Sequence, residues 1–254
     1  MSKLIEKLQW LSEEATQPMG FRAVVSEPRS PSMILIAGIE GPESAKLAAQ
    51  EGADGILVYM GDLRGEAQNL SQIAGALGDI PWGASLERMG DGELSQLLEM
   101  GCDFLVFDAT NAPSRVLWEE RIGRVLKIEP SLSDSLVFTI SQLPIDAVLI
   151  GGGVEEGSTI TVGWVMACQR LVNLVRKPII ALASPNLADR DLKTLHQAGV
   201  AGVVVRLGND FQGGSLSKIR QAIESLPPRV RRRGVGVLLP YHREIQIPGE
   251  VEEI

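Results

Sequence analysis

Apolar runs and amphipathic stretches alternate along the chain in four segments that share one construction. Each segment opens with a short run rich in Val, Ile and Leu, continues through an amphipathic stretch and a turn, and enters a second apolar run. The segments are MILIAGIEGPESAKLAAQEGADGILVYM from Met33, IPWGASLERMGDGELSQLLEMGCDFLVFDA from Ile80, RVLKIEPSLSDSLVFTISQLPIDAVLIGG from Arg124 and KPIIALASPNLADRDLKTLHQAGVAGVVVRLG from Lys177. This pattern predicts a β-α-β unit that is used four times.

The repeat also predicts how the units assemble. The second runs align on Asp54, Asp103, Asp146 and Ala201, which are 49, 43 and 55 residues apart. Because the runs lack polar alternation, we expect parallel strands that are buried on both faces. Four units give eight strands, and no glycine-rich fingerprint follows the first run as a dinucleotide-binding fold would require. We therefore predict one α/β domain, a single (β/α)8 TIM barrel, over residues 33–226.

Two flanking segments lie outside the repeat. Residues 1–32 comprise an N-terminal helix and a lead-in, and residues 227–254 form a C-terminal extension or tail. The helix carries apolar residues at helical spacing, namely Leu4, Ile5, Leu8 and Leu11. It is expected either to cap the bottom of the barrel or to contact a partner. The tail begins with two prolines and contains Arg229 and Arg231 to Arg233, which indicate a solvated linker or an anion contact.

Composition and charge exclude several classes of protein. The 254 residues carry 24 basic and 32 acidic side chains, a net charge of −8, and only 4% aromatics, so we expect no nucleic-acid partner. The longest apolar run, Met33 to Ile39, is far shorter than the roughly 20 residues of a membrane span, so no membrane partner is expected. Lys3 and Glu6 interrupt the N-terminal apolar residues, which argues against a signal peptide and predicts a cytoplasmic protein. Cys102 and Cys168 match no metal or redox spacing and are interpreted as core residues.

Active-site groups of this fold lie at the C-terminal ends of the strands, so the repeat indicates which residues surround the mouth of the barrel. The first strands of the four units end in Glu40, Glu87, Glu129 and Ser184, and the second strands end in Tyr59, Asp108, Gly151 and Arg206. Two positions before the ends of the first strands lie Gly38, Ser85, Lys127 and Leu182. We expect these sets to point inward, because the opposite orientation would press Lys127 and Glu129 against the helices.

Lys127 is the most informative of these residues, because it lies in the middle of the strand RVLKIEP. One interpretation is a buried ion pair with Glu129 or Asp108. The other is an amine whose pKa is lowered by burial, so that it forms a Schiff base with a carbonyl substrate. The acidic strand ends likewise either meet solvent or belong to a functional site.

Two glycine-rich loops are further candidates. Gly213 and Gly214 precede the last helix, where backbone N–H groups are expected to hold a substrate anion with Arg206, or where the glycines simply form a turn. The loop of residues 151–157 is expected to be flexible and to act as a lid. Three further glycines, Gly52, Gly101 and Gly199, are predicted to end helices.

Two phrases of the sequence, EGADGILVYMGD and QAGVAGVVVRLG, resemble the half-units of aldolase-type and ribulose-phosphate-binding TIM barrels over about residues 33–226. The chain also resembles bacterial barrel proteins without an assigned activity. In class I aldolases of this superfamily the Schiff-base lysine lies on the sixth or a nearby strand, whereas the sixth strand here, IDAVLIGGG, has none and Lys127 lies on the fifth. The seventh loop, ASPNLADRD, lacks the glycines that phosphate-binding barrels carry there.

The remaining chemistry is that of carboxylates and lysine, because the histidines, His196 and His242, lie away from the mouth. We predict an aldolase-like lyase in which Lys127, Glu129 and Asp108 are catalytic and the substrate is a small oxo acid or sugar phosphate. The expected substrate-binding residues are Glu40, Tyr59, Glu87, Ser184, Arg206, Gly213 and Gly214.

Two alternatives and an assembly state accompany this prediction. The mouth carboxylates suit a lyase or isomerase that depends on Mg²⁺ or Mn²⁺. A non-catalytic scaffold or binding barrel would need no catalytic constellation at all. A small anionic molecule is the expected ligand, and a symmetric homodimer is the expected assembly.

Overall fold

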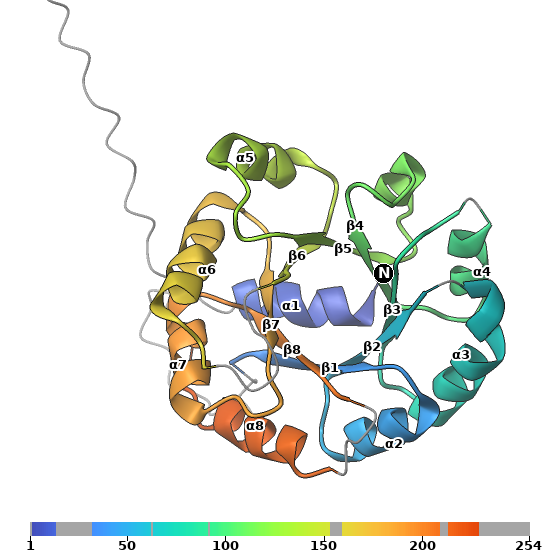
Figure 1. Ribbon diagram of the computed structural model, residues 1–254, viewed down its shortest axis with the longest axis horizontal. Helices are drawn as coiled ribbons and strands as arrows, with labels where there is room; N and C mark the ends of the chain where they lie inside the picture. The colour runs from blue at the N-terminus through green and yellow to red at the C-terminus, as the bar shows by residue number, and fades with distance from the viewer. Residues whose placement is uncertain are drawn as a thin grey trace, which may run out of the picture.

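Eight parallel strands close into one barrel in chain order, so that β8 pairs with β1 (Figure 1). The computed structural model describes residues 2–13, 32–61, 63–90, 92–152, 159–208 and 213–228. The strands are β1 Ile34–Ile39, β2 Gly55–Met60, β3 Trp82–Leu86, β4 Phe104–Asp108, β5 Gly123–Ile128, β6 Ala147–Ile150, β7 Ile179–Ala183 and β8 Gly202–Arg206. The predicted (β/α)8 barrel is confirmed.

Helices precede, connect and follow the strands of the barrel. They are α1 Lys3–Glu13, α2 Pro42–Gln50, α3 Leu63–Leu77, α4 Glu93–Glu99, α5 Asp134–Gln142, α6 Val162–Leu174, α7 Asp189–Ala198 and α8 Ser215–Glu224. The connection from β4 to β5 differs from the others, because it contains the short 3-10 helix η1 (Ser114–Trp118), which Pro113 precedes. Gly52, Gly101 and Gly199 follow helices with φ of 85°, 81° and 96°, a left-handed conformation that glycine adopts without strain.

The fourfold repeat of the sequence is present in the hydrogen bonding of the barrel. In each unit, the residue before the second strand donates its backbone N–H to a carbonyl of the first strand. The four bonds are Asp54 to Leu35 (2.8 Å), Asp103 to Trp82 (2.8 Å), Asp146 to Arg124 (2.8 Å) and Ala201 to Ile179 (2.6 Å). The residues that align in the sequence therefore occupy equivalent places in the barrel.

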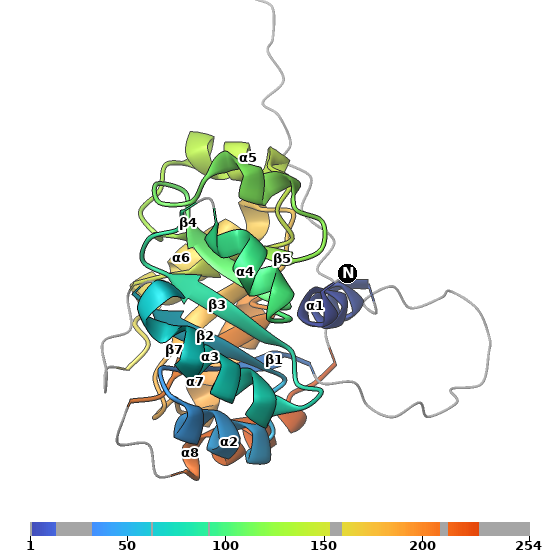
Figure 2. The same ribbon diagram turned by 90° about the vertical axis from the view of Figure 1, so that its right-hand side faces the viewer.

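Helix α1 lies across one end of the barrel (Figure 2). Its apolar side chains form one cluster with side chains of the barrel interior; the helix contributes Leu4, Ile5, Leu8 and Leu11, and the interior contributes residues such as Leu57, Phe104 and Val125. The helix contacts the chain at the N-terminal ends of the strands, where Gly55 and Gly123 begin β2 and β5. Of the two expected roles, α1 therefore takes that of a cap on the barrel bottom.

Asp103 fixes the start of this helix from outside it. The Asp103 carboxylate accepts hydrogen bonds from the Ser2 hydroxyl (2.8 Å), the Lys3 N–H (2.7 Å) and the Leu4 N–H (3.0 Å). A carboxylate at this place satisfies free N–H groups of the first turn and suits the positive end of the helix dipole. The close approach needs glycine at position 123, because a Cβ atom there would lie 2.6 Å from the Ile5 Cγ1 atom.

Both cysteines belong to the apolar core, as predicted. Cys102 and Cys168 are buried free thiols. Burial raises the pKa of both thiols, that of Cys168 to about 12. Within the described ranges, no helix is long and apolar enough to cross a bilayer. The predicted lid from residue 153 onward and the tail from residue 229 lie outside the described residues.

We predict that Asp103→Ala lowers the free energy of unfolding by about 2 kcal/mol, because three hydrogen bonds at the start of α1 lose their acceptor. The measurement is chemical denaturation followed by circular dichroism. Asp79→Ala, in an exposed turn, is the matched control and should change stability by less than about 0.5 kcal/mol. Equal losses in the two variants would contradict the capping role.

Candidate functional site

Among the described residues, the polar side chains of the barrel interior gather near the C-terminal ends of the strands. Lower in the barrel, the interior is filled by the apolar cluster that includes α1, and Tyr59 and Leu182 pack at its upper edge. Strand pairing sets several of the predicted residues directly side by side, namely Asp108 with Lys127, Tyr59 with Ser85, and Gly38 with Arg206. These pairings bring residues of both predicted sets into a ring around the same end of the barrel.

A cavity of about 610 Å³ opens above this ring. Its lining includes six of the predicted site residues, which are Glu40, Tyr59, Lys127, Glu129, Ser184 and Arg206. Apolar side chains of Leu149 and Leu182 also contribute to the wall. Asp108 is not part of the lining, but its carboxylate contacts the Lys127 amine. The mouth therefore combines charged groups with some apolar side chains.

Lys127 projects from β5 into the cavity and pairs with Asp108 at the end of β4. The Nζ atom of Lys127 lies 3.3 Å from Oδ2 of Asp108, and the side chains keep 33% and 41% of their exposure. Gly151 provides the space, because a Cβ atom at that position would lie 3.1 Å from Cε of Lys127. An ion pair with Asp108 is therefore present, but it is partly exposed where the sequence suggested a buried pair, and the amine faces the cavity.

Arg206 forms a second ion pair on the β8 and β1 side of the mouth. Its guanidinium lies 2.8 Å from Oε1 of Glu40 and stacks 4.7 Å from the centre of the Tyr59 ring. Gly38 leaves room for that ring, because a Cβ atom there would lie 2.7 Å from Cε2 of Tyr59. Burial raises the pKa of Tyr59 to about 12, and the nearby Arg206 charge opposes this rise. The Tyr59 phenol is therefore neutral at physiological pH.

Glu129 follows β5 and lies above the same wall as Lys127. Its carboxylate lies beside Gly152, where a Cβ atom would come within 2.8 Å of Oε2. The next residues are held by Arg170 of α6, which donates to the Pro130 and Leu132 carbonyls at 2.9 and 2.7 Å and pairs with Asp134. Arg170 therefore positions the loop that carries Glu129. Arg170 could not be predicted as a site residue, because no local sequence pattern links α6 to that loop.

Two of the predicted site residues have a smaller part in the cavity than expected, namely Glu87 and Ser184. Glu87 is exposed after β3 and does not line the cavity. Ser184 does line it, but its hydroxyl is mostly buried and accepts the Asn186 N–H at 3.3 Å. Among the described residues, no three His, Cys, Asp or Glu side chains are grouped so that they would hold a metal ion.

The glycine pair before α8 faces a carboxylate of the protein itself. The Gly214 N–H donates to Glu51, and the Ser217 N–H donates to Oε2 of Glu51 at 3.1 Å. Gly213 and Gly214 have φ of 92° and 89°, so the turn itself requires glycine. The anion at this helix start is therefore the side chain of Glu51, and neither glycine lines the cavity.

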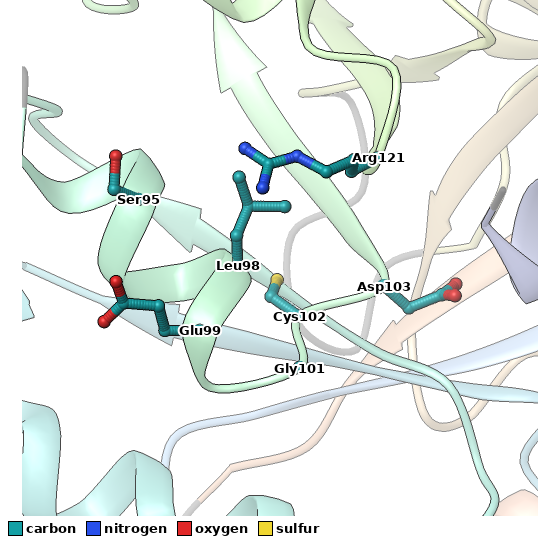
Figure 3. A pocket seen from close by; sticks show the side chains of 7 residues that line it. All are labelled: Ser95, Leu98, Glu99, Gly101, Cys102, Asp103 and Arg121. Carbon is teal, nitrogen blue, oxygen red and sulfur yellow. The ribbon is translucent and has the colours of Figure 1, made fainter.

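A second hollow, of about 530 Å³, lies between α4 and the chain that leads into β5 (Figure 3). The carboxylate of Asp103 points away from this hollow, toward the start of α1. Arg121 is bound by Glu119, with contacts of 2.8 and 2.9 Å. Two of the three charged side chains that line the hollow, Asp103 and Arg121, are thus engaged elsewhere.

Comparisons with known proteins agree with the fold. Phosphoribosyl anthranilate isomerase from Thermococcus kodakaraensis has a TM-score of 0.56 at 16% identity, with 76% of this chain and 96% of that chain covered. The YdjI aldolase from Escherichia coli K12 has a TM-score of 0.56 at 10% identity, covering 88% and 93%. Orotidine 5'-phosphate decarboxylase from Pyrococcus horikoshii OT3 has a TM-score of 0.57 at 12% identity, covering 76% and 100%.

No family model matches the chain, and no curated protein matches it in sequence. The resemblance to aldolase-type and ribulose-phosphate-binding barrels is thus confirmed at the level of the fold. At 10–16% identity it carries no activity from one protein to another.

We predict that Tyr59 ionises near pH 12, against an ordinary value of 10.0. Subtracting the tyrosinate absorbance of Tyr59→Phe from that of the wild type isolates this group. The raised folded-state pKa means that the stabilisation linked to the Tyr59 proton is complete below pH 10 and is lost as the pH rises toward 12. The wild type should therefore lose more stability than Tyr59→Phe over that interval. A difference curve centred at pH 10 would contradict the burial of the phenol.

We predict that Glu51→Gln lowers the free energy of unfolding by about 1 kcal/mol, because the start of α8 loses its charged acceptor. Thermal or chemical unfolding measures the change. Glu99→Gln, an exposed residue at the end of α4, provides the control. If Glu51→Gln is as stable as the control, the Glu51 carboxylate contributes nothing to α8.

Proposed function

We propose that the barrel mouth binds a small carbonyl compound and that the protein is an aldolase-like lyase acting on an oxo acid or sugar phosphate. The observation that carries the proposal is the position of Lys127. It provides the only amine among the described residues that line the cavity, and a carboxylate lies 3.3 Å from its nitrogen. An amine with an adjacent acid-base group is what carbonyl activation through a Schiff base requires.

The proposed chemistry uses residues that already contact one another. Asp108 accepts a proton from the Lys127 ammonium, and the neutral amine attacks the substrate carbonyl carbon to form a carbinolamine. The proton then returns to the carbinolamine hydroxyl, which leaves as water, and the protonated imine accepts the electron pair of the carbon–carbon bond that breaks. Glu129, on the same wall of the cavity, accepts the hydroxyl proton of the leaving fragment, which departs as a carbonyl compound. The enamine that remains on Lys127 is then protonated and hydrolysed by water, which releases the second product and returns the amine.

The arrangement of carboxylates favours this proposal over the Mg²⁺ or Mn²⁺ alternative. Glu40 is paired with Arg206 and Asp108 with Lys127, so two of the four expected ligands have cationic partners. Glu87 does not reach the cavity, and the described residues contain no group of three metal-ligating side chains. Among the described carboxylates, a divalent cation would thus face Glu129 alone, which gives too few oxygen ligands for a hard cation.

We predict that borohydride reduces an imine between Lys127 and a bound oxo acid or sugar phosphate, and that intact mass and peptide mapping locate the adduct on Lys127. Lys127→Ala should lose this adduct. Lys46→Ala, which removes an exposed lysine of α2, is the matched control and should keep it.

Two results would count against the proposal. One is the absence of an adduct on the wild type across a panel of oxo acids and sugar phosphates. The other is equal trapping in Lys127→Ala. Lys127 would then serve only as the structural partner of Asp108, and the scaffold alternative would gain support.

A further inference from the structure

We infer that the substrate carries a carboxylate at the end remote from its carbonyl, and that this carboxylate replaces Glu40 as the partner of Arg206. The inference rests on the proposed function for the carbonyl end only. For the carboxylate end, the inference is based on the contacts of Arg206 with Glu40 and Tyr59. It is also based on the opposed positions of the two ion pairs around the barrel.

The two ion pairs lie on opposite sides of one cavity. Lys127 and Asp108 belong to the adjacent strands β5 and β4, whereas Arg206 and Glu40 belong to β8 and the end of β1. In a closed ring of eight strands, the pair β4 and β5 faces the pair β8 and β1. Both cations line the same cavity of about 610 Å³. A ligand whose carbonyl reaches Lys127 therefore extends toward Arg206.

The contacts of Arg206 allow a ligand carboxylate to replace the carboxylate of Glu40. Its guanidinium rests on the Tyr59 ring, which packs between Gly38 and the barrel interior and so keeps Arg206 at the wall. Glu40 lies in the loop after β1, and the side chains of Arg206 and Glu40 are 57% and 43% exposed. Because an ion pair with this much exposure has little net stability, a ligand carboxylate can compete with Glu40 at small cost.

The charges around the cavity favour a carboxylate over a phosphate. The described lining holds two cations, Lys127 and Arg206, and two carboxylates, Glu40 and Glu129. A ligand carboxylate that displaces Glu40 leaves the charge at Arg206 unchanged, whereas the second negative charge of a phosphate would meet the acidic groups uncompensated. The start of α8, where N–H groups hold phosphate in other barrels of this fold, is already bound by Glu51.

The test compares two aldehydes of similar length, 4-oxobutanoate and pentanal, which differ in the terminal carboxylate. Each is titrated against the full-length protein with cyanoborohydride, and the adduct on Lys127 is quantified by peptide mapping. For the wild type we expect half-maximal trapping at an approximately threefold lower concentration of the oxo acid, the size of one partly exposed ion pair. Arg206→Gln should reduce this ratio to about one.

Two further variants separate the role of Glu40 from general charge effects. Glu40→Gln removes the competing carboxylate and should increase the preference for 4-oxobutanoate by about threefold, as expected for an exposed ion pair. Arg121→Gln, which removes an exposed arginine bound by Glu119 away from the mouth, is the matched control and should keep the wild-type ratio. Longer ω-oxo acids then identify the chain length that spans the cavity.

The outcomes separate this inference from the proposed function. Equal trapping of the two aldehydes on wild-type Lys127 would overturn the carboxylate site and leave the amine chemistry in place. A stronger preference for an aldehyde that ends in phosphate would overturn the choice of carboxylate. If neither aldehyde modifies Lys127, the proposed function fails. Calorimetry with glutarate then tests the carboxylate site at Arg206 by itself. Binding that is lost in Arg206→Gln would support the carboxylate site, and no binding to the wild type would overturn it.

Discussion

The contact between α1 and the lower end of the barrel interior determines where a ligand can bind. Leu4, Leu8 and Leu11 of the helix fill the space below the interior layer of the strands, and Asp103 fixes the first turn of the helix. The lower interior is consequently apolar and filled. Within the described part of the barrel interior, space for a ligand remains at the C-terminal ends of the strands, where polar side chains replace apolar ones. The position of the cavity thus follows from how the opposite end is closed.

Most of this architecture could be predicted because it follows from local patterns. Apolar runs without polar alternation indicate parallel strands that are buried on both faces, and the alignment on Asp54 and Asp146 corresponds to equivalent hydrogen bonds in the barrel. Asp103 occupies the third equivalent position, yet its side chain binds α1, which lies outside the repeat. A repeat predicts what its copies share. It cannot predict a contact that only one copy makes.

The candidate site could be predicted in part for the same reason. The two-residue period of a strand turned Lys127 inward once its strand was known, and Asp108 was one of its two expected partners. Glu51 and Arg170 could not be found in this way, because each acts on a segment distant in the sequence. Gly213 and Gly214 illustrate the difficulty, since a helix start that binds a ligand and one that binds a carboxylate of the protein have the same local sequence.

The opposed ion pairs explain how an acidic chain can present two cations in one cavity. Each cation stays partly exposed and has a carboxylate beside it, so neither stands as an unpaired charge at the mouth. The consequence for recognition is that a ligand enters by replacing a carboxylate that is already present, as Glu40 is at Arg206. Selectivity then depends on how well the ligand carboxylate replaces the Glu40 carboxylate at Arg206. The two groups have the same charge, so they differ mainly in their position relative to the guanidinium. The Tyr59 ring, which packs against Gly38, determines that position, because the Arg206 guanidinium stacks on the ring whether or not Glu40 is bound to it.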